Sequence, residues 1–127
     1  MTPETEYFLA KARRLLVEAE AMLKINLHEA AGRTAYLAGF HAAQGLISER
    51  TGKAAKTHRG VHSELNRLLK DYPGVGEDVR IFLSQTYNLK AIADYETGPD
   101  AEVPLARAVA AHEDAKKFVA AIERLLA

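Results

Sequence analysis

The stretch Gly32–Ile47, GRTAYLAGFHAAQGLI, decides the fold of this chain. Four apolar residues recur at i, i+4, i+7 and i+11 and so share one face of a helix: Tyr36, Phe40, Ala43 and Ile47. Small residues are frequent in the same stretch, which lets another helix approach closely: Ala35, Ala38, Gly39, Ala42 and Ala43. Glycine inside a helix costs roughly 1 kcal/mol relative to alanine, so we expect Gly39 and Gly45 to have a packing reason. The stretch therefore predicts a tightly packed helix.

Helical spacing recurs along most of the rest of the chain, and strand patterns are scarce. Thr2 is suited to be an N-cap, with Pro3 in the first helical position, and Gly52 is suited to end the second helix. The helices predicted from spacing and breaks cover about residues 3–25, 27–50, 60–72, 77–95 and 104–126. We expect an all-α, up-and-down bundle of four long helices and a short one, with residues 1–127 as a single domain.

The composition excludes several classes of protein. The chain has 127 residues, 17 basic and 17 acidic side chains and no cysteine. The lack of cysteine excludes disulfides, thiolate catalysis and cysteine-based metal sites, and fits a cytoplasmic location. The zero net charge argues against a general nucleic-acid coat or a polybasic membrane binder. We expect no signal peptide, and no run approaches the ~18 apolar residues of a membrane span.

His41 is the one titratable side chain in the middle of the opening stretch. It shares a stripe with Arg33 and Leu37, and eight residues at ~1.5 Å rise place Arg33 about 12 Å from His41 along the helix axis. Both side chains are thus expected to line one groove without direct contact. Two interpretations stay open for His41: a packed, hydrogen-bonded histidine, or a ligand-binding or catalytic one.

The segment 49–64, ERTGKAAKTHRGVHSE, has the best candidate residues for phosphate binding. Lys56, His58, Arg59 and His62 lie in or beside an acid-free run near a predicted helix start, where anions are favoured. His58 and His62 are also spaced i, i+4, which can hold a metal ion, but a third ligand is not obvious nearby. A nucleotide or RNA phosphate contact and a solvated loop both remain open.

Two further groups lie in the later helices. In QTYNLKAIADYETG, residues 85–98, Lys90 and Asp94 are spaced i, i+4 and can form an exposed ion pair, with Tyr95 a partly buried anchor. Arg107 and His112 have four residues between them, so they do not share a helical line. In an alanine-rich helix such a pair easily arises by chance.

Three stretches, in this order and spacing, together resemble the HEPN domains, and in particular the small stand-alone branch named UPF0332. The second helix of that branch has an aromatic–small–Phe-His-Ala-Ala pattern, matched from Tyr36 to Ala43. Its next loop has Lys-Thr-His, matched by residues 56–58. A later Arg-x-x-x-Asp-Tyr element is matched at its end by Asp94 and Tyr95. The resemblance covers nearly the whole chain.

The resemblance implies a helical bundle that forms a homodimer. Many HEPN proteins are endoribonucleases that need neither metal nor cofactor, with an Arg-x(4–6)-His motif at a dimer cleft. There the histidine acts on the 2′-hydroxyl and the arginine holds the phosphate. Many are encoded beside a minimal nucleotidyltransferase as a toxin–antitoxin pair, and some receive AMP on a tyrosine near the motif. The resemblance thus implies Tyr95 as the candidate AMP acceptor of this chain.

This sequence departs from the family at the catalytic motif. Lys90 stands where the branch has arginine, no histidine accompanies it, and a lysine lacks the planar fork of a guanidinium. The one literal match to the motif spacing, Arg107 to His112, lies in the last helix. We therefore favour a nucleotide- or RNA-binding partner of a nucleotidyltransferase.

The alternative is a metal-independent endoribonuclease toxin. The candidate catalytic positions are Lys90, Asp94 and Tyr95. The remaining site residues are expected to contact RNA or nucleotide: Arg33, His41, Lys56, His58, Arg59 and His62.

Overall fold

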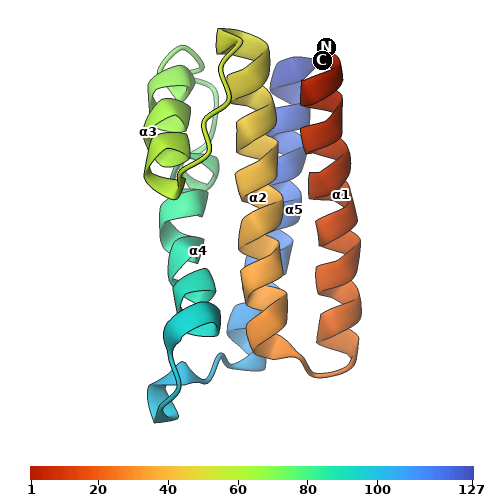
Figure 1. Ribbon diagram of the computed structural model, residues 1–127, viewed down its shortest axis with the longest axis vertical. Coiled ribbons are helices and arrows are strands. Elements are labelled where there is room, and N and C mark those ends of the chain that lie inside the picture. Colours follow the sequence, from red (N-terminus) through yellow and green to blue (C-terminus); the bar gives the residue numbers. More distant parts are fainter.

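The structure, a computed structural model, describes the backbone of residues 1–127 and every side chain except that of Asp100. It contains five α-helices and one short 3-10 helix: α1 Pro3–Lys24, α2 His28–Thr51, α3 His58–Leu69, α4 Glu77–Tyr95, η1 Pro99–Ala101 and α5 Leu105–Leu126. The long helices run alternately down and up, so both termini lie at the same end (Figure 1). The predicted all-α, up-and-down bundle is confirmed.

Local capping explains where the first two helices begin and end. The Thr2 hydroxyl accepts a hydrogen bond from the Thr5 backbone N–H, and Pro3 fills the first position of α1, as expected from the sequence. Asn26 has φ 63°, which turns the chain sharply into α2. Gly52, with φ 70°, ends α2 in the left-handed conformation, and its N–H bonds the Ser48 carbonyl.

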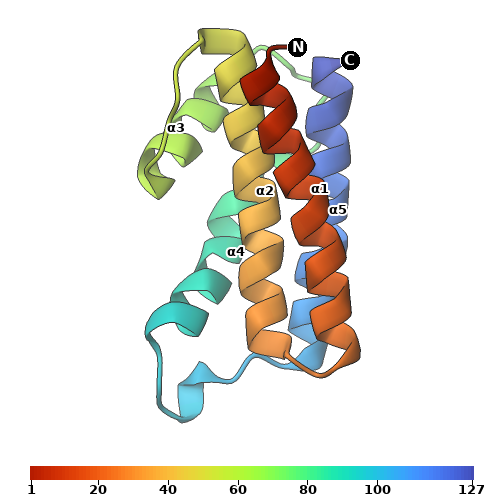
Figure 2. The same ribbon diagram turned by 45° about the vertical axis from the view of Figure 1, so that its right-hand side comes forward.

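The predicted short helix over residues 60–72 occupies different bounds in the structure. Helix α3 begins two residues earlier, at His58, because the Thr57 hydroxyl accepts from the Gly60 N–H and caps the first turn. The helix ends at Leu69, before the turn that leads to Pro73. The loop after α2 turns back along that helix, so the first residues of α3 lie beside the middle of α2 (Figures 1 and 2).

Helix α2 is the centre of the bundle. Along its length Ala35, Ala38, Ala42 and Ala43 are completely buried, and it packs against all four other helices. At Gly39 the ring of Phe82 from α4 lies where a Cβ atom would be, so this glycine is required for the contact. Phe82 stacks in turn on Phe118 of α5, with ring centroids 4.8 Å apart.

The length and polarity of the helices decide whether any of them could span a membrane. In the described part of the chain, every helix is too short or too polar to cross a bilayer.

Candidate functional site

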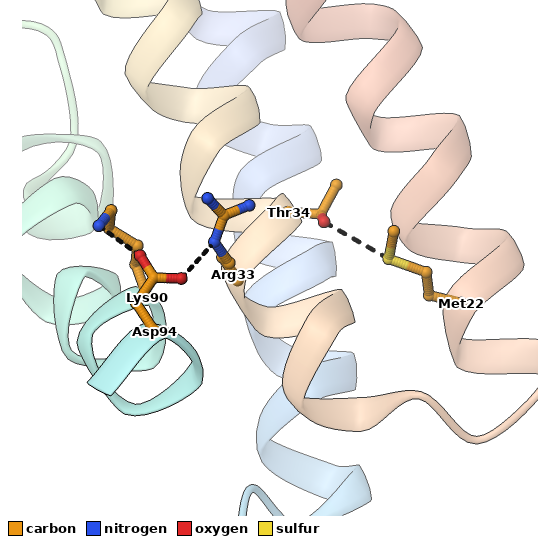
Figure 3. Close-up of polar contacts among 5 residues, drawn as sticks. All are labelled: Met22, Arg33, Thr34, Lys90 and Asp94. Atoms are coloured by element: carbon orange, nitrogen blue, oxygen red, sulfur yellow. Dashed lines mark hydrogen bonds and ion pairs between the residues drawn. The ribbon is translucent and has the colours of Figure 1, made fainter. Parts of the chain in front are cut away.

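Three charged side chains join α2 to α4 at one face of the bundle (Figure 3). The Arg33 guanidinium donates from Nε to Asp94 Oδ1 at 2.7 Å, and Lys90 donates from Nζ to Asp94 Oδ2 at 2.5 Å. Asp94 thus uses both carboxylate oxygens on cations from two different helices. The sequence predicted the Lys90–Asp94 pair but not the part played by Arg33. We call Arg33, Asp94 and Lys90 the charged triad.

The triad is less exposed than the sequence indicated. Exposure of the side chain is 11% for Lys90 and 22% for Asp94, whereas Arg33 is 42% exposed. The hydrogen bond from Lys90, followed by that from Arg33, lowers the pKa of Asp94, and the bond to Asp94 raises the pKa of Lys90. Asp94 and Lys90 are therefore both ionised at neutral pH, and the guanidinium of Arg33, a permanent cation, leaves the triad with one positive charge in excess. Asp94 holds two cations in place and is unsuited to donate a proton.

Tyr95 follows the triad at the end of α4 and is 73% exposed. The interpretation of this residue as a partly buried anchor is therefore wrong. The Lys90 ammonium lies 5.4 Å from the centre of its ring, within the range of a cation–π contact. The hydroxyl of Tyr95 is open to solvent beside a fixed positive charge.

A second polar group lies next to the triad, where α3 begins. The Tyr36 hydroxyl is 2.9 Å from Nδ1 of His58 and 2.8 Å from Nε2 of His62. The two histidines lie one turn apart on α3, so both can face the same point on α2. Tyr36 itself has no exposed surface. We call these three residues the Tyr36 cluster.

Aromatic rings surround the Tyr36 cluster. The ring of Phe40 lies 4.7 Å from that of His58, and Tyr87 of α4 lies within 5.2 to 5.7 Å of all three rings of the cluster. Tyr87 is one turn before Lys90 on α4. The cluster and the triad are therefore parts of one site, which we call the α2–α3–α4 site.

Burial explains the electrostatics of the cluster. It lowers the pKa of both His58 and His62 and raises that of Tyr36. Lys90 lowers the pKa of His58 further, and Asp94 acts in the opposite direction. Both imidazoles are consequently neutral at pH 7, and the charges of the triad act directly on His58.

His41 lies further along α2 and is half-buried. Its Nδ1 is 2.7 Å from the Gln44 side-chain oxygen, while the Gln44 amide nitrogen donates to the Ala55 carbonyl at 2.9 Å. Because that carbonyl orients the amide, Nδ1 of His41 must be the donor. Burial lowers the pKa of His41, and Lys11 and Arg14 of α1 act in the same direction. This is the packed, hydrogen-bonded histidine of the first interpretation.

Lys56 and Arg59, the other predicted phosphate contacts, are exposed on either side of His58. The first turn of α3 carries no acidic residue. Of the two predicted stretches, the structure brings His58 of the first within electrostatic reach of Lys90 and Asp94 of the second, and Arg33 joins Asp94 from α2. His41 lies beyond Phe40 and is not part of the triad or of the Tyr36 cluster.

Sequence reasoning missed Tyr36 and Tyr87 as site residues. Tyr36 was interpreted as packing, because its spacing with Phe40 and Ile47 already explained it. The i, i+4 spacing of His58 and His62 was the one signal in the sequence, because two histidines on one face of a helix can share a hydrogen-bond partner on a neighbouring helix.

Arg107 and His112 do not form a site. His112 is only 4% exposed and donates from Nε2 to the Leu16 backbone carbonyl of α1 at 3.0 Å, whereas Arg107 is exposed. The pair matches the nuclease spacing in sequence, but its histidine serves packing between α1 and α5.

A hollow of about 530 Å³ adjoins the triad at the start of α2. Arg33 and Ala93 line one part of it, and His28, Glu29 and Glu102 line another. Nε2 of His28 is buried and has no hydrogen-bond partner within the described residues. Among those residues, no three histidine or acidic side chains converge as a metal ion would require.

The chain matches the HEPN domain family over residues 5–127. It is 32% identical to a UPF0332 protein of Archaeoglobus fulgidus over 116 residues, which cover 91% of this chain and 90% of that protein. Its fold is similar to that of the crystal structure of TT1696 from Thermus thermophilus. The comparison has a TM-score of 0.75 and 25% sequence identity, and it covers 97% of this chain and 98% of TT1696. Together with the five-helix bundle, these similarities show that the chain belongs to the HEPN domain family.

Proposed function

We propose that this HEPN protein binds the phosphate groups of a nucleotide or of RNA at the α2–α3–α4 site, and that it is the helical partner of a minimal nucleotidyltransferase. The observation that carries the proposal is the charged triad. Arg33 and Lys90 share a single carboxylate, so the triad keeps a net positive charge whose position is fixed by two helices.

The surroundings of the triad favour an anion. Helix α3 begins at His58, which is within electrostatic reach of Lys90, and its first turn carries no acidic residue, so the helix dipole there attracts anions. Arg33 binds Asp94 through Nε, and within the described residues its two Nη atoms make no hydrogen bond. A phosphate oxygen can therefore bond the guanidinium without displacing Asp94.

The same geometry favours binding over catalysis. In the motif of a HEPN nuclease the histidine follows the phosphate-binding arginine on the same helix, whereas here Asp94 follows Lys90 and is its ionised partner. A carboxylate in that state can neither donate a proton nor replace an imidazole at neutral pH.

Binding is tested by titrating the protein with AMP and with a short single-stranded RNA, read by calorimetry and by fluorescence anisotropy. We expect saturable binding that weakens as salt rises and drops in Lys90→Ala. Arg107→Ala, which removes an exposed cation on α5, is the matched control and should bind like the unmodified protein. Equal binding by both variants would contradict the proposed site.

Tyr95 supports the pairing with a nucleotidyltransferase. Its exposed hydroxyl is accessible to another protein, whereas the Tyr36 hydroxyl is buried between two histidines. We propose Tyr95 as the acceptor of an AMP group. Incubation with the transferase encoded nearest to this gene and ATP should increase the intact mass by one AMP in the unmodified protein and in Tyr87→Phe, but not in Tyr95→Phe.

We also propose that the protein is a homodimer. Leu105 and Val109 lie one turn apart on α5 and are 47% and 40% exposed, which suits a helix contact. Light scattering should give twice the mass of the chain, and a mass of one chain at all concentrations would refute the dimer.

A second function has an observation in its favour. The His58 imidazole is neutral and lies within electrostatic reach of Lys90, so it could take a proton in an endoribonuclease reaction. Expression in a bacterial host would then arrest growth and degrade RNA, and Lys90→Ala would abolish both effects. Unchanged growth and intact RNA would exclude this second function.

A further inference from the structure

The Tyr36 hydroxyl has one proton but two close imidazole neighbours. It lies 2.9 Å from Nδ1 of His58 and 2.8 Å from Nε2 of His62, in a position with no exposed surface. An O–H can donate to only one of these nitrogens. The other nitrogen must then carry a proton and donate it to the Tyr36 oxygen.

This arrangement couples the two neutral rings. When Tyr36 donates to Nδ1 of His58, His58 carries its proton on Nε2, and His62 must donate from its own Nε2. In the opposite arrangement both rings carry the proton on Nδ1. His58 and His62 therefore have the same tautomer in either case, because both rings hydrogen-bond to the single hydroxyl of Tyr36.

His58 is the histidine of the cluster on which the charges of Lys90 and Asp94 act. The rings packed around it are those of Tyr36 and Phe40 from α2 and Tyr87 from α4, and His62 lies one turn further along its own helix. Nε2 of His58 has no hydrogen-bond partner in the part of the chain that the structure describes. The proton on this atom decides whether His58 offers a donor or an acceptor to a ligand.

We propose that Tyr36 and His62 are positioning residues that hold His58 as a neutral hydrogen-bond donor, through Nε2, to a bound phosphate. The inference rests on the proposed phosphate binding at the same site. A deprotonated phosphate oxygen only accepts hydrogen bonds, so it selects the arrangement in which both rings carry the proton on Nε2.

The change between the two arrangements balances without a further reactant. Nε2 of His58 gains a proton from water, one proton passes from His58 to Tyr36 and another from Tyr36 to His62, and Nδ1 of His62 releases a proton to water. His62 lines a small hollow of about 70 Å³ together with Asn66, Arg80 and Ser84, which has room for water.

Binding of AMP and of inorganic phosphate tests the donor. The glutamine in His58→Gln places an amide nitrogen near the position of Nε2, so this variant should keep affinity within about threefold. His58→Ala should weaken binding about tenfold, as expected for a lost hydrogen bond to a charged group. Equal affinity of His58→Ala and the unmodified protein would overturn the inference while leaving the proposed function standing.

Nitrogen-15 NMR of the imidazoles tests the coupling, which a merely structural role would not produce. In the AMP complex we expect both His58 and His62 to carry the proton on Nε2. In Tyr36→Phe, which keeps the ring but removes the hydroxyl, the tautomer of His62 should no longer follow that of His58. Different tautomers in the unmodified protein would overturn the inference even without ligand, whereas failure of the protein to bind any phosphate compound would overturn the proposed function.

Discussion

The Arg33 guanidinium on α2 donates to the Asp94 carboxylate on α4 at 2.7 Å, across 61 positions of sequence. Lys90 occupies the other oxygen of the same carboxylate. This contact connects the most buried helix of the bundle to the end of α4, where Tyr95 lies.

The first prediction concerns the pH dependence of stability. The pKa of Asp94 is lowered in the folded protein, so its contribution to the free energy of unfolding is complete above its unfolded pKa of about 3.9 and is lost as the pH falls through the folded value. Asp94→Asn should therefore lower the stability at pH 7 and have less effect at pH 3. Urea unfolding at both pH values measures this, with the exposed Glu96→Gln as control. A difference that is constant with pH would refute the prediction.

The second prediction concerns the side chain at position 90. Lys90→Arg keeps the positive charge and adds the planar fork, so it should bind AMP at least as tightly as the unmodified protein. Lys90→Ala should lose about tenfold in affinity and show a shallower dependence on salt. Calorimetry at two salt concentrations separates these effects. A weaker Lys90→Arg variant would show that the shape of the ammonium, rather than its charge, is required.

The third prediction compares two glycines of α2. An alanine at Gly39 would overlap the ring of Phe82, whereas at Gly45 the nearest atom to a new Cβ is Phe8 Cβ at 3.4 Å, an ordinary contact. Gly39→Ala should lower the free energy of unfolding by about 1–3 kcal/mol. Gly45→Ala should be neutral or stabilise by up to about 1 kcal/mol through helix propensity. Thermal unfolding of both variants decides this, and equal effects would contradict the packing described for Gly39.

The fourth prediction separates packing from chemistry in α5. His112→Ala removes a buried ring and its bond to the Leu16 carbonyl, so it should destabilise the protein by about 2–3 kcal/mol. Arg107→Ala should stay within about 0.5 kcal/mol. Neither variant should change AMP affinity where it is folded. A specific loss of binding in folded His112→Ala would return this pair to the candidate site.

Local signals were enough to predict the bundle. Thr2 and Gly52 mark helix ends through contacts within a few residues, and the breaks at Pro73 and Gly98 are equally local. The two-residue difference at the start of α3 also has a local cause, because the Thr57 hydroxyl caps the first turn of that helix. The spacing and small residues of α2 predicted a tightly packed helix, and in the structure this helix contacts all four others.

The site depended on contacts that one sequence cannot provide. Lys90 and Asp94 are four residues apart and looked like an exposed pair, and only the approach of α2 brings Arg33 to them and buries Lys90. The sequence pattern predicts only a packing role for Tyr36, because its hydrogen-bond partners lie on the following helix. The expectation that Gly45 is needed for close packing is not supported, because the structure has room for a Cβ atom there.

The central claim is that phosphate binds where α2, the start of α3 and α4 meet. The most direct measurement is an NMR titration of the nitrogen-15-labelled protein with AMP, followed for backbone and arginine side-chain signals. The account predicts saturable shifts at Arg33, His58 and Lys90, and none at Arg107 or His112. Shifts confined to α5, or no shift at millimolar AMP and with single-stranded RNA, would contradict it.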